Sequence, residues 1–220
     1  MVRSLKVETA ARHASGRGAA TRQQLIEAAI DTLKQRGFAG ASARVIADRA
    51  RVNQGLIFYH FGSVVGLLVS ALDEVSAVRA ARYGDAVARA TSPSELVGVA
   101  ESIFREDLEQ GHAAVLLAMI AGAASTPDLG RKVAVRIQPW TQFATEAVRD
   151  ALDHAALGAI LPAGDVGFAI VALYLGLEML AQVGGDRASV DALFDRAKAL
   201  VPLLARVGAA IPSDETGVVP

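Results

Sequence analysis

The chain has 220 residues, of which 52% are hydrophobic, and its formal net charge is −1. This length and hydrophobic content are enough to bury a sizeable core, so they exclude a chain that is disordered throughout. The lack of cysteine excludes disulfide bonds, thiolate catalysis and cysteine-ligated zinc.

The net charge conceals an uneven distribution of charge along the chain. Residues 1–62 contain ten Lys and Arg against four Asp and Glu, a balance of +6, whereas the remainder has a balance of −7. A basic first part followed by an acidic remainder is typical of a chain whose first part binds a polyanion.

The amino-terminal segment suggests an arm followed by a helix. Residues 1–20 are rich in Ala, Ser, Gly and Arg with little apolar periodicity, so we expect a flexible basic arm. This segment lacks the unbroken apolar run of a signal peptide. A first helix is expected from Thr21, as its N-cap, to the RGF sequence, where Gly37 can adopt the left-handed conformation that ends a helix.

Two short helices are expected next. Ser42 is a suitable N-cap for the second helix, and Asn53 for a third helix from Gln54 to about Phe61. Two short helices joined by a tight turn, after a longer helix, are typical of a helix-turn-helix domain. We therefore predict such a domain over residues 21–66.

The rest of the chain indicates longer helices and no strands, so the predicted fold class is all-α. Residues 67–211 are expected to form a larger helical domain, and residues 212–220 a disordered tail. Ser92 and Thr126 each precede a proline at the first position of a helix. Pro139 is expected to kink or divide its helix.

The most apolar segment is Val166 to Val183, which is about long enough to span a bilayer. Glu178 lies inside it, where hydrocarbon would cost ~2.5–3.5 kcal/mol, and no Lys or Arg cluster flanks it. We therefore expect a buried helix in a soluble, cytoplasmic protein with no membrane partner.

The third expected helix carries side chains suited to DNA recognition. Helical spacing places Ile57 and Phe61 toward the first two helices and leaves the opposite side to face DNA. Gln54 can make a bidentate contact to adenine, and Leu56 can meet a thymine methyl group. Singly, each residue also fits a surface or packing role. Together they predict DNA contacts from Ser42, Arg44, Asn53, Gln54, Gly55, Leu56, Tyr59 and His60.

From Thr21 to Leu68 the motifs RGF, IA, A-x-V-x-x-G and FYHFGS follow in order. In these motifs the sequence resembles the TetR/AcrR family of one-component bacterial repressors. The resemblance implies a homodimer that forms through its last two helices and binds a palindromic operator. It also implies that the larger helical domain binds a small effector that releases the DNA.

Three positions depart from the family's usual pattern. Val45 stands where the family usually has an aspartate, Phe58 where it has a phosphate-contacting tyrosine, and Val64 where it has a lysine. A lost phosphate contact lowers affinity fairly uniformly across sequences, and the basic arm can compensate. The alternative is a ligand-binding or scaffold protein of the same fold that has lost specific DNA binding.

An effector site is expected where large side chains and lone polar groups occur in apolar helices. Aromatic residues at helical spacing are also frequent in cores, and Pro139 beside Trp140 favours open space between helices. A hydrophobic or amphipathic effector is the class expected. The candidate residues are His112, Met119, Trp140, Gln142, Phe143, Phe168, Tyr174 and Glu178.

An enzyme is the competing class of function. The four histidines are widely spread, with no HExxH motif and no Gly-rich phosphate loop after a strand. Asp150, Asp153 and His154 lie on one helical turn, but two further metal ligands are not evident, and a solvated charged face explains them better. We expect no enzyme activity, no cofactor and no metal.

Overall fold

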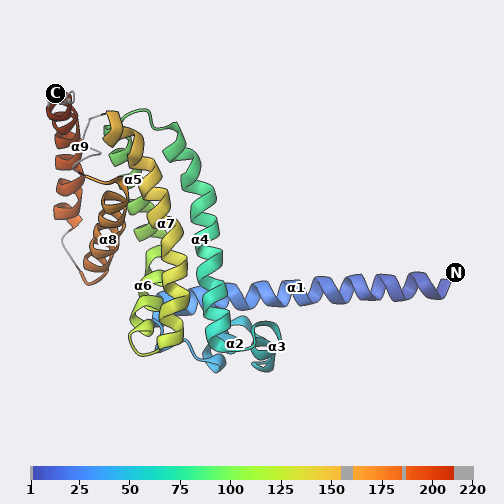
Figure 1. The fold of residues 1–220 in the computed structure, drawn as a ribbon. Coiled ribbons are helices and arrows are strands. Elements are labelled where there is room, and N and C mark those ends of the chain that lie inside the picture. The colour runs from blue at the N-terminus through green and yellow to red at the C-terminus, as the bar shows by residue number, and fades with distance from the viewer. Residues whose placement is uncertain (1, 155–160, 185–186, 211–220) are drawn as a thin grey trace, which may run out of the picture. The chain divides into compact units, whose positions relative to one another are not determined.

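The computed structural model describes residues 2–154, 161–184 and 187–210, and this part of the chain consists of helices and their connections (Figure 1). The predicted tail over residues 212–220 lies outside the described residues. The helices are α1 (Val2–Arg36), α2 (Ala43–Ala50), α3 (Gly55–Phe61), α4 (Val64–Arg89), α5 (Pro93–Gln110), α6 (His112–Ala123), α7 (Pro127–His154), α8 (Ala163–Gln182) and α9 (Arg187–Ala210).

The chain divides into two compact units. The first contains Met1–Val78 and Ala114–Val133, and the second contains Arg79–Ala113 and Ala134–Pro220. The all-α fold predicted from the sequence is confirmed over the described residues.

In the first unit, α1 packs against α2, and buried side chains of α1 to α4 contribute to the core. Ser42 caps α2 as predicted, because its hydroxyl accepts from the amide of Val45 at 3.4 Å. Arg51 ends α2 in the left-handed conformation, with φ of 55°. The large, fully buried side chains of the first unit are Leu25, Ile26, Leu33, Ile46, Ile57, Leu67, Leu68, Leu72, Val115, Met119 and Leu129.

Two boundaries in the first unit differ from the sequence prediction. The expected flexible arm over residues 1–20 continues α1, so Thr21 lies inside a helix and is not its N-cap. The Ala and Arg content that suggested an arm also has high helix propensity, and no proline interrupts it. The third helix begins at Gly55, with Gln54 as the residue before it.

In the second unit, α5 packs against α8 and α9. Ser92 caps α5 as predicted, by accepting from the amide of Glu95 at 3.2 Å. The carboxylate of Glu95 accepts in turn from the amide of Thr91 at 2.6 Å. Between α5 and α9, Arg105 pairs with Asp191 at 3.1 Å.

Of the two outcomes expected at Pro139, division of the helix is contradicted, because α7 runs without a break from Pro127 to His154, and a kink there stays a prediction. A long helix tolerates the loss of one backbone hydrogen bond when its neighbours remain. The apolar α8 is not a buried helix within this chain, since Phe168, Leu173 and Leu180 are each more than half exposed.

Among the helices of the described residues, α8 is long and apolar enough to cross a membrane by length and composition alone. The α3–α4 pair passes the same test only if its 64° bend is counted as part of one span. Glu178 lies within α8 and is fully buried. A helix of this composition is equally usual in a soluble protein, where its apolar side is covered by other helices.

The close contact between α7 and α8 gives a first prediction. A Cβ at Gly167 would lie 2.2 Å from Oγ1 and 2.7 Å from the backbone nitrogen of Thr145. Gly167→Ala is therefore expected to lower the free energy of unfolding by about 1–3 kcal/mol. Gly84→Ala is the matched control, because a Cβ there would meet no described atom within 4 Å beyond its own turn of helix. Alanine inside α4 should raise stability by about 0.5–1 kcal/mol.

Urea denaturation of the two variants beside the wild type measures this difference. Equal stability of Gly167→Ala and Gly84→Ala would contradict the tight helix contact.

Candidate nucleic-acid interface and effector site

The short helix α3 has one buried side and one exposed side. Ile57 is fully buried, as the spacing predicted, and Phe61 is half-buried under the guanidinium of Arg22, which lies 5.1 Å from the ring centre. Tyr59 is 81% exposed and Phe58 is 51% exposed. The helix therefore presents two aromatic side chains to solvent while it is anchored from behind.

Two of the predicted DNA-contacting side chains also position the helices. Asn53 Oδ1 accepts from the amide of Gly55 at 2.7 Å and so fixes the first turn of α3. Ser42 does the same for α2. Because these two side-chain oxygens already accept a hydrogen bond, Ser42 and Asn53 are less able to accept another from DNA. The neighbouring backbone amides at the start of each helix are better placed to contact phosphate.

The junction of α3 with α4 is fixed by a close backbone contact. The two helices are joined through Gly62, which has φ of 74°. The amide of Gly66 donates to Ser63 Oγ at 2.9 Å. A Cβ at Gly66 would lie 2.3 Å from the carbonyl oxygen of Phe61, so no side chain fits there. The orientation of α3 is thus tied to the first turn of α4.

Basic side chains on α2 serve two different purposes. Arg49 ties α2 to α1, because it pairs with Asp31 at 3.3 Å and donates to Gln35 at 2.5 Å. Arg44 has a side chain that is 86% exposed, and its separation from Asp48 is 3.9 Å. Such an exposed ion pair holds little energy, so Arg44 remains available to an anion.

All eight predicted DNA-binding residues lie on α2, α3 and the segments that precede them. Ser42, Arg44, Asn53, Gln54, Gly55 and Tyr59 are exposed, whereas Leu56 and His60 are half-buried. Sequence reasoning did not include the exposed Phe58, whose position next to Tyr59 in the FYHF segment was the available signal.

In the second unit, Asp107 of α5 is the centre of a buried polar cluster. It is fully buried and pairs with Arg79 of α4, whose Nε donates at 3.1 Å. Tyr83 donates its hydroxyl to the same carboxylate at 2.9 Å, and Tyr174 of α8 also donates to it. His112 Nδ1 of α6 lies 3.3 Å away. Asp107 therefore has several partners, drawn from three other helices.

Glu178, one turn beyond Tyr174 on α8, is in the opposite situation. It is fully buried, and neither carboxylate oxygen has a hydrogen-bond partner among the described residues. Burial, followed by the negative charge of Asp107, raises the pKa of Glu178 to about 7. The hydroxyl of Tyr174 and the charge of Arg79 act in the other direction, but both groups are engaged with Asp107.

Arg79 is the cation that both carboxylates depend on. Burial alone would lower the pKa of Arg79, but the charge of Asp107 leads the opposing interactions and the net pKa is raised. The guanidinium therefore stays charged, and the two carboxylates share one buried cation.

The cluster brings together five of the residues predicted for an effector site. Trp140 lies with its ring centre 4.5 Å from the guanidinium carbon of Arg79, and Phe143 meets it edge to face at 6.1 Å. The others are His112, Tyr174 and Glu178.

Three predicted effector residues do not join the cluster. Met119 belongs to the buried core of the first unit, and Gln142 and Phe168 are exposed. Sequence reasoning missed Arg79, Tyr83 and Asp107. The signal available for Asp107 was its place three residues after Phe104, on the buried stripe of an amphipathic helix.

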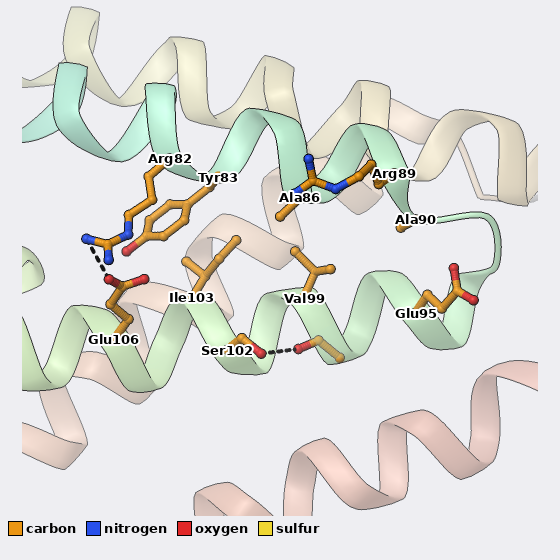
Figure 2. Close-up of a pocket in the computed structure, with 11 residues that line it drawn as sticks. Arg82, Tyr83, Ala86, Arg89, Ala90, Glu95, Val99, Ser102, Ile103 and Glu106 are labelled. Carbon is orange, nitrogen blue, oxygen red and sulfur yellow. Dashed lines mark hydrogen bonds and ion pairs between the residues drawn. The ribbon is translucent and has the colours of Figure 1, made fainter.

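A groove of about 550 Å³ lies between α4 and α5 (Figure 2). Tyr83, Ala86, Val99 and Ile103 give it an apolar lining, and Arg82 pairs with Glu106 across it at 2.8 Å. Tyr83 connects the groove with the cluster, because it lines the groove and its hydroxyl donates to Asp107. The groove therefore offers an apolar surface adjoining a polar cluster.

The described residues contain no group of three His, Asp or Glu that could hold a metal ion. The side chains of Asp150 and His154 lie outside the described part of the chain, so their predicted role as a solvated face is not tested.

The raised pKa of Glu178 predicts how stability varies with pH. Ionisation is less favourable in the folded chain than in the unfolded one, so this group's contribution is fully present below about pH 4.5 and is lost as pH rises through about 7. Between pH 5 and 8, the wild type should lose up to about 3 kcal/mol relative to Glu178→Gln.

Urea denaturation at a series of pH values measures this difference. The variant retains the other groups of the cluster, so their titration cancels in the comparison. Glu146→Gln, at an exposed position on α7, is the control and should follow the wild type. Parallel pH profiles for Glu178→Gln and the wild type would show that Glu178 is not the titrating group.

Comparison with known proteins gives a family match for the amino-terminal part of the chain. Residues 25–71 match the family described as bacterial regulatory proteins, tetR family. The regulator BetI 1 of Chromohalobacter salexigens, described as HTH-type, is 43% identical over 68 residues. That match spans 31% of this chain and 32% of the relative, so it is confined to about a third of each protein.

Two further matches extend over most of the chain. The HTH-type transcriptional repressor SCO4008 of Streptomyces coelicolor is 26% identical over 189 residues, which cover 81% of this chain and 92% of the relative. The crystal structure of a TetR-family regulator from Cytophaga hutchinsonii superposes with a TM-score of 0.70 at 19% identity. It covers 84% of this chain and 95% of that one, which establishes the shared fold.

Proposed function

Because residues 25–71 match the model of the tetR family of bacterial regulatory proteins, we propose that the chain is a member of this family and a dimeric transcriptional repressor. It binds a palindromic DNA operator and leaves it when a small hydrophobic or amphipathic effector binds the second unit. The observation that carries the proposal is α3, which is anchored by the fully buried Ile57 and exposes Tyr59, while Gln54 is exposed at the residue before the helix.

The exposed side of α3 has chemistry that suits base and phosphate contacts. Gln54 offers the paired donor and acceptor that adenine requires, and Leu56 offers an apolar contact to a thymine methyl group. Tyr59 and the exposed Arg44 can donate to phosphate oxygens. The basic balance of residues 1–62 supplies the long-range attraction.

The exposed apolar side chains of α8 and α9 support a homodimer. Phe168 is 66% exposed and Leu173 and Leu180 are more than half exposed on α8, as are Leu200 and Leu203 on α9. An exposed apolar surface of this kind marks an interaction site. A second copy of the chain is the proposed partner, since a two-fold dimer pairs like surfaces and presents two heads to a palindrome.

Helix α4 supports a route from effector to DNA. It is one continuous helix that carries Gly66, in backbone contact with the end of α3, and Arg79, in the buried cluster. We place the effector at this cluster, with Trp140, Tyr174 and Glu178 as its principal contacts. An effector that rearranges the partners of Arg79 shifts the position of α4 and so the fraction of dimers able to engage both half-sites.

The first test of the proposal is the loss of a base contact. Gln54→Ala should weaken binding to the operator by about 1–3 kcal/mol while leaving binding to scrambled DNA unchanged. Fluorescence anisotropy on a labelled duplex from upstream of the protein's own gene, at several salt concentrations, measures both affinities. Gln142→Ala, at an exposed position on α7, is the control.

Equal weakening on operator and scrambled duplex would contradict the base contact of Gln54. Wild-type protein that prefers no genomic duplex over scrambled DNA would instead favour the alternative, a ligand-binding protein whose head no longer binds DNA specifically.

The second test restores a phosphate contact. Val64 begins α4 at the position where the family usually has lysine, and it is half-buried. Val64→Lys should tighten binding to operator and scrambled DNA alike and steepen the logarithmic salt dependence by about 1 per protomer. The same anisotropy titrations measure it, with thermal melting as a check on folding. An unchanged salt slope would show that the start of α4 does not approach the phosphates.

A further inference from the structure

With His112 neutral, the buried cluster of the second unit holds one more negative charge than positive charge when Glu178 is ionised. Asp107 is already satisfied by Arg79, by the hydroxyls of Tyr83 and Tyr174 and by its contact with His112. Glu178 has no donor on either oxygen within the described part of the chain, although it is fully buried. The missing hydrogen-bond donor and the missing positive charge therefore both concern one side chain, Glu178.

Nothing in the described packing of α8 requires a carboxylate at this position. A buried charge without a partner costs several kcal/mol, and an apolar or amide side chain of similar size would avoid that cost. Buried polar groups nearly always have partners, so a fully unpartnered one calls for a donor from outside the chain. A ligand that supplies this donor recovers energy that folding alone does not.

The surroundings of Glu178 favour a cationic donor over a neutral or an anionic one. Asp107 and Glu178 together repel an anion, and a neutral hydroxyl would leave the extra negative charge in place. Aromatic rings already accept a cation in this cluster, since Arg79 lies 4.5 Å from the ring centre of Trp140 and 5.8 Å from that of Tyr174. A second cation at Glu178 would therefore pair with a carboxylate in a cluster that already holds one cation against aromatic rings.

We propose that the effector carries a protonated amine on an apolar body, and that Glu178 binds the ammonium group. This inference rests on the proposed function, in which a small molecule binds the second unit. The apolar groove that Tyr83 shares with the cluster offers a surface for the body of such a molecule.

Three probes of the same shape test the charge preference directly: phenylbutylamine, phenylbutanol and phenylbutyrate. Trp140 is the only tryptophan of the chain and lies in the cluster, so its fluorescence reports binding. The wild type should bind the amine at least about tenfold more tightly than the alcohol, as expected for a charged hydrogen bond, and the carboxylate most weakly. Equal affinity for amine and alcohol would overturn the proposal without recourse to any variant.

The variant Glu178→Gln tests whether the preference for the amine over the alcohol depends on this one side chain. The variant should lose at least about tenfold in affinity for the amine and keep the wild-type affinity for the alcohol. Glu146→Gln should behave as the wild type toward both, because this side chain is exposed. Undiminished amine binding by Glu178→Gln would show that another group holds the ammonium.

Operator binding by the same protein samples separates this inference from the proposed function. A wild type that binds operator but shows no preference for the amine overturns the inference alone. A wild type that prefers the amine but binds no duplex selectively supports the inference and contradicts the proposed repressor.

Discussion

The structure of the second unit depends on the buried ion pair between Arg79 and Asp107. Two tyrosine hydroxyls complete the coordination of the carboxylate, and His112 contacts it, so a single side chain of α5 joins residues from α4, α6 and α8. Removing one partner of a buried pair typically costs on the order of 3–5 kcal/mol, because the other charge is left without compensation. Asp107 thus has few alternative arrangements, while Glu178 beside it has no hydrogen-bond partner among the described residues. The contrast between a saturated and an unsaturated carboxylate makes this cluster a candidate for ligand recognition and not only a structural bridge.

The first unit depends on a different constraint, the backbone contact between Gly66 and the carbonyl of Phe61. A short helix such as α3 is marginal by itself, so its direction must come from its neighbours. The buried Ile57, the hydrogen bond from the amide of Gly55 to Asn53 and the start of α4 provide that direction. Because α4 also carries Arg79, the same helix takes part in orienting α3 and in forming the buried cluster.

The region of α2 and α3 was largely predictable from the sequence, because the residues that begin and end these helices act locally. Ser42 and Asn53 satisfy amides two or three residues away, and Gly62 permits a positive φ, so each acts within one turn of chain. The buried cluster was only partly predictable, since Arg79 and Asp107 are separated by 28 residues and become partners only after folding. The exposure of α8 was mispredicted. Composition shows that so apolar a helix must be covered, but it does not show whether the same chain or a second copy covers it. The first residues form a helix where an arm was expected, since their Ala and Arg content is consistent with either.

The central claim is that the α2–α3 head recognises a specific DNA sequence as one half of a symmetric site. Selection from a random duplex library by the purified wild type, followed by sequencing of the bound fraction, tests this most directly and requires no candidate operator. We expect enrichment of an inverted repeat whose half-site centres are about one helical turn or slightly more apart, with an adenine and a neighbouring thymine among the fixed bases of each half. A bound fraction with no enriched sequence, at salt concentrations where nonspecific binding is already weak, would contradict this claim.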